Sequence, residues 1–140
     1  MTNQIIEGIS NALFKEFGEQ YEIHMEEIKQ GLKEPCFFVS CLNPNIKRYP
    51  GKRYMQTNQF CIQYFPREGN EQRECNDVAE RMMWTLEFIT VEDFKMHGTN
   101  MNYEVVDGVL NFFVNYDGFL RKVEKQEKIE TIEVKENVKG

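Results

Sequence analysis

The sequence predicts a single α+β domain in which two helices pack on a mainly antiparallel β-sheet. Residues 3–17 and 71–88 repeat apolar side chains at helical spacing, whereas the segments between and after them alternate apolar and polar residues. The order of these elements shows no strand–helix–strand repeat of the kind that implies a parallel sheet. At 140 residues the chain fits one domain and can bury enough surface to fold without a disulfide or a metal.

The first helix and the first strand are predicted from a change in the spacing of apolar residues, from helical spacing to alternation. Residues 3–17 place apolar side chains on one helical face, and Gly18 supplies the stop. Residues 21–27 then alternate, which predicts a half-buried strand with His24 on the solvent side between two glutamates. A catalytic role for His24 is the less favoured alternative.

The second strand is expected to begin at Cys36, after a turn framed by Gly31 and Pro35. Cys36 and Cys41 lie an odd number of residues apart, so a regular strand directs their thiols to opposite faces. They therefore cannot share a metal or a disulfide unless the strand breaks between them. Both faces of this strand are apolar, which predicts a central strand that is covered on both sides, or covered on one side by a partner. One face carries Phe37, Val39 and Cys41, and the other carries Cys36, Phe38, Ser40 and Leu42.

The third strand, over residues 54–65, is joined to the second by a basic loop around a Pro50-Gly51 turn. The loop is the one concentrated positive segment in a net-negative chain, and its basic residues are Lys47, Arg48, Lys52 and Arg53. Two interpretations remain open for these four residues. They form a solvated hairpin tip, or they contact an acidic neighbour or a phosphate.

The second helix is predicted over residues 71–88, with a core stripe that includes Cys75. The Met82-Met83-Trp84 cluster is expected to pack in the core, in preference to the alternative that it binds a ligand. Beyond residue 89 the chain is again typical of strands, and Asp107-Gly108 predicts a tight hairpin. A continuous strand over 109–123 would be too long for this domain, so Asp117-Gly118 predicts a bend, unless the far end pairs with another subunit. Residues 124–140 are predicted to be a charged arm that is disordered or that adds a strand to a neighbour.

The composition and the motifs argue against several classes of protein. The net charge of −6 and the pI near 5.0 disfavour a dedicated nucleic-acid-binding protein. No apolar stretch is long enough to span a membrane, and the first ten residues lack a signal-peptide pattern, so we expect a cytoplasmic protein. The four cysteines form no C-x-x-C pair, and no catalytic or phosphate-binding motif is present. We therefore expect no catalytic residues, no metal and no cofactor.

Three segments carry a resemblance to a known family. The stretches "QGLKEPCFFV", "TNQFCIQYFP" and "VVDGVLNFFVNYDGFLRKV" occur in this order, and the helix ending in "WTLEFITV" separates the second from the third. In these features the chain resembles the phage tail terminator family of prophages in Gram-positive bacteria. The resemblance covers residues 1–123, which we treat as one tail-terminator-like domain, and does not extend to the arm.

The resemblance implies a subunit that forms a ring, often hexameric, at the end of the tail tube. Such rings stop tube polymerisation and offer the surface on which the filled head docks. The implied partners are copies of the chain, the tail tube protein and a head–tail connector, with DNA passing through the lumen without specific binding. The implied location is the head-proximal end of the virion tail, after assembly in the host cytoplasm.

We expect two kinds of contact in such an assembly. The basic loop would meet the acidic surface of a neighbour or of the tube, and apolar strand residues would be buried against other copies of the chain. The strand residues that we single out are Phe37, Val39 and Phe113. The alternatives are another head–tail connector, such as a stopper or adaptor, and more distantly a nucleic-acid-binding regulator or a small enzyme.

Overall fold

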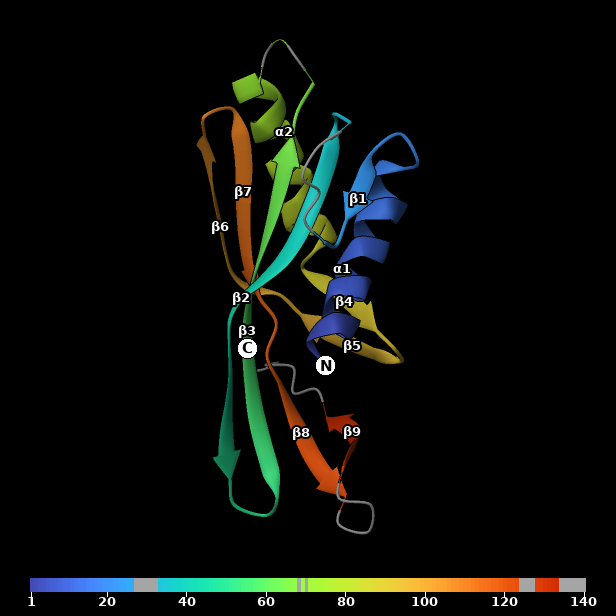
Figure 1. Cartoon of the computed structure of the whole chain (residues 1–140), viewed down its shortest axis with the longest axis vertical. Helices are drawn as coiled ribbons and strands as arrows, with labels where there is room; N and C mark the ends of the chain where they lie inside the picture. The colour runs from blue at the N-terminus through green and yellow to red at the C-terminus, as the bar shows by residue number, and fades with distance from the viewer. Residues whose placement is uncertain (27–32, 68, 70, 124–127, 134–140) are drawn as a thin grey trace.

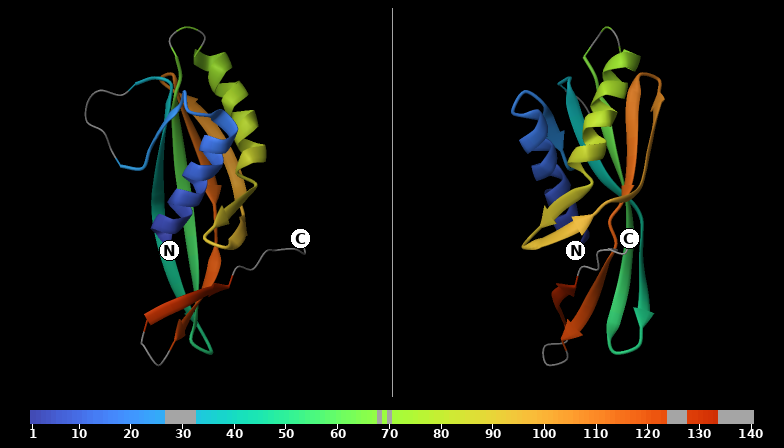
Figure 2. Two further views of the ribbon diagram at one scale, coloured as in Figure 1. Left: turned by 90° about the vertical axis from the view of Figure 1, so that its right-hand side faces the viewer. Right: turned by 180° about the vertical axis from the view of Figure 1, so that it is seen from behind.

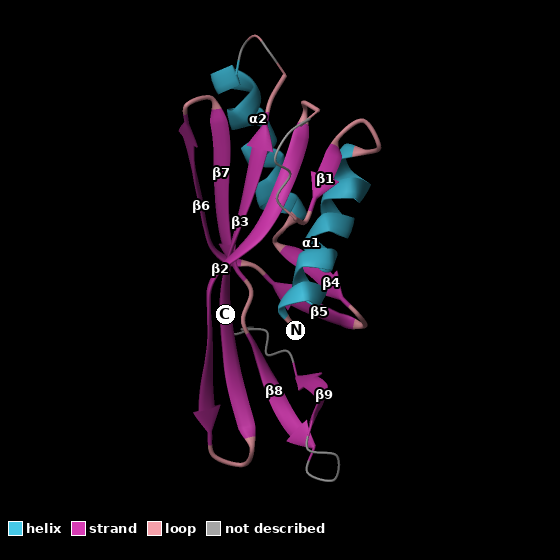
Figure 3. Cartoon of the chain, in the orientation of Figure 1, coloured by secondary structure: helices cyan, strands magenta, loops and turns pink. Residues whose placement is uncertain are grey.

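A computed structural model of the chain describes residues 1–26, 33–67, 69, 71–123 and 128–133. Two helices and nine strands are present in this part of the chain (Figures 1 and 3). Their bounds are α1 Thr2–Phe17, β1 Glu22–His24, β2 Cys36–Tyr49, β3 Arg53–Phe65, α2 Glu71–Thr85, β4 Phe88–Val91, β5 Phe94–His97, β6 Thr99–Val106, β7 Val109–Asn115, β8 Gly118–Val123 and β9 Lys128–Glu133. The predicted α+β class, with two helices and a mainly antiparallel sheet, is confirmed.

The main sheet is built around the long antiparallel pair β2–β3. One half of the sheet has the strand order β1-β2-β3-β7-β6, whereas β8 pairs with the first residues of β3 and β9 pairs with β8. In Figure 1 the helices lie beside the upper half, and the lower half projects beyond them. A shift in register between Leu42 and Asn45 marks the point where β2 passes from one half to the other.

The core lies between the helices and one face of the upper sheet, which we call the inner face (Figure 2). Alternate residues of β2, β3 and β7 point into it, as the period of two predicts. Ile5, Ile9 and Leu13 of α1 and Val78, Ala79 and Met82 of α2 close it from the other side. The residues of β2, β3 and β7 in this core are Phe37, Val39, Phe60, Ile62, Tyr64, Leu110, Phe112 and Val114.

The second helix is shorter than the sequence predicts, because residues after Thr85 leave it. Phe88–Val91 instead forms a hairpin with β5 in a separate two-stranded sheet. Ile89 and Met96 of this hairpin still lie in the core. Ile89 therefore continued the apolar spacing of the helix in the sequence although it is not part of the helix. At Gly98 an added Cβ would lie 2.6 Å from the Leu86 carbonyl oxygen, so only glycine permits this close return of the chain.

The first strand differs from expectation in direction and length. β1 has three residues and runs parallel to β2, which makes the sheet mixed. The His24 side chain is 18% exposed, and its Nε2 atom lies 3.2 Å from Glu22 Oε1 on the same face of the strand. The predicted solvent-facing position is therefore only partly correct. Residues 27–32, with the predicted turn at Gly31, lie outside the described residues.

The hairpin and the bend predicted near the C-terminus are both present. Asp107 and Gly108 have φ angles of 54° and 77° and join β6 to β7, as a two-residue turn of this type requires. The chain then breaks at Tyr116 and Asp117, and both β7 and β8 pair with β3 of the same chain. Of the predicted arm, residues 128–133 form β9 on the edge of β8, and 124–127 and 134–140 lie outside the described residues.

Candidate assembly surface

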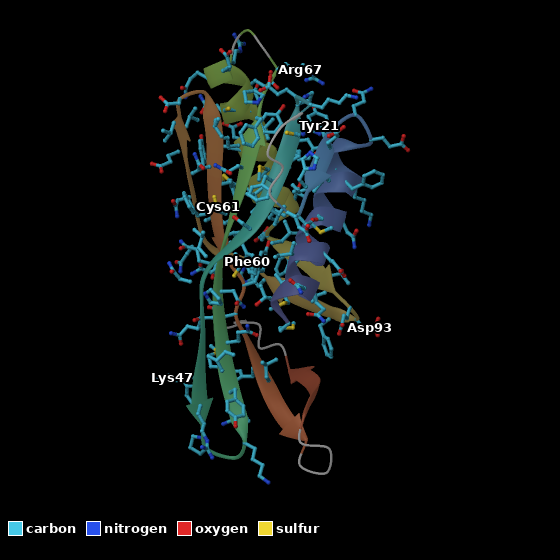
Figure 4. The ribbon with its side chains drawn as sticks, in the orientation of Figure 1. Tyr21, Lys47, Phe60, Cys61, Arg67 and Asp93 are labelled. Carbon is cyan, nitrogen blue, oxygen red and sulfur yellow. The ribbon has the colours of Figure 1, made fainter. Side chains whose placement is uncertain are left out.

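The four basic residues of the predicted loop lie at the tip of the β2–β3 pair. We call residues 45–57 the projecting hairpin, because they extend past the helices at the lower end of the molecule (Figure 1). Gly51 and Lys52 have φ angles of 81° and 62°, which the turn between the strands requires. In Figure 4, Lys47 lies on this hairpin, far from Tyr21 and Arg67 at the other end.

The basic side chains are divided between the two faces of the hairpin. Lys47 and Arg53 share a face with aromatic rings: Lys47 Nζ is 5.9 Å from the centre of the Tyr49 ring, and Arg53 Cζ is 5.6 Å from that of Phe119. Tyr49 and Phe119 pack edge to face at 5.8 Å. Arg48 pairs with Tyr54 in the register and so lies on the other face.

Ile46 shares the Arg48 face and is 60% exposed. The hairpin therefore presents an apolar and a cationic side chain together on this face. Because removing an exposed isoleucine side chain from water is energetically favourable, this face is suited to burial against another surface.

Phe113 belongs to the side of the sheet that no described helix covers, which we call the outer sheet face. It pairs with Cys61 and Asn102, and side chains of Phe38 and Gln63 lie on the same face. Most residues of this face are half-buried, and charged residues are confined to its margins. Phe113 is thus placed where a partner could cover it. Phe37 and Val39, by contrast, are fully buried in the core, so the prediction that they are spare apolar surface is wrong.

The helical side carries several exposed large apolar side chains that the sequence pattern did not predict. Trp84 is 76% exposed, and Phe14, Met83 and Phe88 are also exposed. The prediction that the Met82-Met83-Trp84 cluster packs in the core holds for Met82 alone. Trp84 lies nine residues after the buried Cys75, which places it on the opposite side of the helix. This spacing in the sequence indicates that Trp84 is exposed.

A groove of about 560 Å³ runs between α1 and β4 on the same helical side. Its rim carries three carboxylates (Glu7, Glu16 and Glu92) and one amine, that of Lys15. The ring of Phe88 also lines it. Gly8 brings the helix onto β4, because a Cβ at this position would lie 2.7 Å from the carbonyl oxygen of Thr90.

A second cluster joins β3 to α2 at the upper end of the sheet. The Tyr64 hydroxyl donates to Glu74, whose carboxylate also accepts the Arg67 backbone N–H at 3.2 Å. Burial and this hydrogen bond raise the pKa of Tyr64, so the phenol stays protonated. The arrangement satisfies a buried hydroxyl and fixes the start of the helix, which is a structural role.

The cysteines form no site in the described part of the chain. All four are free thiols, and the register places Cys36 on the outer sheet face and Cys41 on the inner one, as predicted. Burial raises the pKa of Cys36 to about 11 and also raises that of Cys61, which disfavours the reactive thiolate. Among the described residues, no group of three histidine, cysteine or acidic side chains could hold a metal ion.

Charge is distributed unevenly over the chain. Residues 36–65 contain the four basic residues of the tip and no carboxylate, so this segment carries +4. Since the whole chain carries −6, the remaining residues together carry −10. A positive β-hairpin therefore extends from a chain whose remaining residues are net acidic.

Comparison with known proteins identifies a relationship over most of the chain. A family model described as phage tail terminator protein matches residues 4–128. No curated protein matches the sequence. Among the described residues, no helix is both long and apolar enough to cross a membrane.

Proposed function

The chain belongs to the phage tail terminator protein family, and from this premise we propose that it forms a ring that caps the tail tube. The family is one of structural virion proteins, so a role in phage tail assembly follows from membership itself. The finer proposal is that the ring, a hexamer in the virion, ends tube polymerisation and provides the surface for head docking. The ring would lie at the head-proximal end of the tail after assembly in the host cytoplasm.

The observation that carries the ring proposal is the presence of two different exposed surfaces on one subunit. The projecting hairpin is basic and offers Ile46, whereas the helical side is acidic and offers Trp84 and Phe88. Contacts between unlike surfaces are heterologous, and they close into a ring when the rotation between copies permits it. In the proposed ring, Lys47, Arg48, Lys52 and Arg53 contact a neighbouring subunit or the tube, and Phe113 is covered by a partner.

The acidic majority of the surface is compatible with a lumen that passes DNA. Like charge repels phosphate, so a wall with few cations allows the genome to move without specific binding. The remaining proposed partners are the tube protein on one face of the ring and a head–tail connector on the other.

The test is electron microscopy of phage particles from a host in which this gene is deleted. If the ring stops tube growth, tails are longer than normal and lie beside DNA-filled heads that lack tails. Tails of normal length that fail to join heads would assign the chain to a connector role instead. Intact particles of normal tail length would refute both assembly roles.

A further inference from the structure

We propose that the groove between α1 and β4 is the receptor for the tip of the projecting hairpin of a second copy of this chain. The proposal rests on the proposed ring and adds to it the identity of the two contacting surfaces. Its occupant is specific: the face of the hairpin that bears Ile46 and Arg48.

The groove has the size and rigidity of a binding site for a few side chains. Its volume of about 560 Å³ falls within the range of roughly 300–1,000 Å³ that is usual for ligand clefts. Its floor is fixed, because α1 is held against β4 at Gly8 and both elements send side chains into the core. A preformed groove of this kind loses little entropy when it is filled.

The chemistry of the groove favours a cation with an apolar neighbour. Glu7 and Glu92 are exposed on opposite walls, whereas Glu16 already accepts a hydrogen bond from Arg81 Nε at 3.0 Å. The Phe88 ring is 42% exposed beside these carboxylates, with His97 stacked on it at 4.7 Å and Lys95 Nζ 4.6 Å from its centre. Guanidinium groups bind carboxylates in two-pronged fashion, so arginine suits Glu7 and Glu92, and the exposed part of the Phe88 ring suits an apolar neighbour.

The hairpin tip supplies this combination. Lys47 and Arg53 are held over rings on the outer face, whereas Arg48 lies with the exposed Ile46 on the face toward the helical side of the sheet. Arg48 is thus the basic strand residue oriented for insertion. The tip extends away from α1 and β4, the elements that line the groove of its own chain (Figures 1 and 2), so the groove that it fills belongs to another copy.

The docked arrangement places Arg48 between Glu7 and Glu92 and lays Ile46 on Phe88. Because the tip and the groove are separate surfaces of one subunit, each copy gives one tip and receives another. The contact is therefore directional around the ring.

Reversal of charge tests the pairing. In a host deleted for the gene, the full-length Arg48→Glu variant and the Glu7→Lys/Glu92→Lys variant should each reduce the yield of normal-length, head-joined tails at least about tenfold, because like charges then meet. The triple variant restores opposite charge and should recover most of that yield. Glu71→Lys, at an exposed residue that begins α2, is the matched control and should have no effect, because α2 reaches the groove only at its other end, through Thr85.

Crosslinking tests the contact without reliance on tail length. Arg48→Cys and Glu92→Cys are produced together as full-length proteins in the deleted host, and the extract is treated with a bismaleimide, because an arginine–carboxylate pair separates its two Cα atoms by more than a disulfide spans. This pair should give a crosslinked dimer, and neither protein alone nor Arg48→Cys together with Glu71→Cys should do so. The native thiols give little background, since three of the four are buried.

The outcomes separate this inference from the proposed function. Loss of tails with Arg48→Glu but not with the groove variant, or equal crosslinking to positions 92 and 71, would overturn the groove as the receptor and leave the terminator role standing. A gene deletion without effect on tails would refute the proposed function, and the crosslink would still decide whether tip and groove meet.

Discussion

At the scale of single residues, the position of an apolar side chain around a helix determines whether it is buried or exposed. Met82 and Trp84 are two residues apart on α2, yet Met82 is fully buried and Trp84 is the most exposed large apolar residue among those described. The burial of one and the exposure of the other follow from an angle of about 200° between them around the helix axis.

These two residues should therefore respond differently to truncation. Met82→Ala should lower the free energy of unfolding by about 2–5 kcal/mol, because it leaves a cavity in the core. Trp84→Ala should change it by less than about 0.5 kcal/mol, as is usual at exposed positions. Urea denaturation measures both, and a large loss of stability in Trp84→Ala would show that the indole packs against the folded subunit.

The buried thiol of Cys36 should make stability depend on alkaline pH. Its pKa is about 9 when the thiol is exposed and about 11 in the folded chain, because burial and the nearby Glu22 disfavour the thiolate. The unfolded chain therefore loses this proton first as pH rises above about 9. The contribution of Cys36 is fully present below pH 9 and is lost towards pH 11, with a slope of at most about 1.4 kcal/mol per pH unit.

The measurement is the free energy of unfolding at several pH values between 8 and 11, for the native chain and for Cys36→Ala. The alanine variant is expected to start from a lower stability and to show a shallower decline. Tyr64 and Tyr116 also have raised pKa values and contribute to the decline in both proteins. Parallel curves would contradict the assignment to Cys36.

At the scale of elements, the join between the two halves of the sheet depends on one polar side chain. Asn58 Nδ2 donates to the Tyr116 carbonyl oxygen at 3.2 Å, and its backbone N–H donates to Asp117 Oδ1 at the same distance. The Tyr116 N–H donates back to the Asn58 carbonyl oxygen at 3.0 Å. These bonds satisfy the backbone where β7 ends and β8 begins, which regular pairing cannot do.

Asn58→Ala should accordingly lower the free energy of unfolding by about 1–3 kcal/mol, because the Tyr116 carbonyl loses a buried partner. Gln59→Ala is the control, since Gln59 is the next residue of β3 but lies half-buried on the outer sheet face. The shift of the urea midpoint at unchanged m-value measures the difference. An equal effect of both changes would indicate that the bonds of the Asn58 side chain add nothing specific.

At the scale of the whole molecule, the core and the projecting hairpin are separate. The helices pack on the upper half of the sheet, and none of residues 45–57 belongs to the hydrophobic core cluster. Substitutions of charged residues at the tip are therefore expected to cost little folding free energy, in keeping with the proposed assembly contact.

Reversal of Arg48 and Lys52 to Glu together should consequently abolish assembly and leave the fold intact. Thermal unfolding should remain within a few degrees of the native chain, because substitutions at exposed loops cost less than about 0.5 kcal/mol. Complementation of the gene deletion measures assembly. If the reversed protein still supports tails of normal length, the tip is only a solvated turn.

The class of fold and most strand faces could be predicted from the amino-acid sequence. The periods of β2, β3 and β7, the turn at Asp107-Gly108 and the bend at Asp117-Gly118 are local properties of consecutive residues, and local sterics and alternation suffice to predict them. The basic tip could also be predicted, because its four basic residues are close together in the sequence. The family resemblance, carried by the same strands, agrees with the family match over residues 4–128.

Which apolar surfaces are covered could be learned only from the folded chain. Phe37, Val39 and Phe113 look alike in the sequence, yet two are core residues and one lies on the outer sheet face, because both helices pack on the same side. The parallel direction of β1, the β4–β5 hairpin and the groove beside α1 likewise depend on segments distant in sequence. Such contacts are set by the packing of the whole chain, and no local pattern records them.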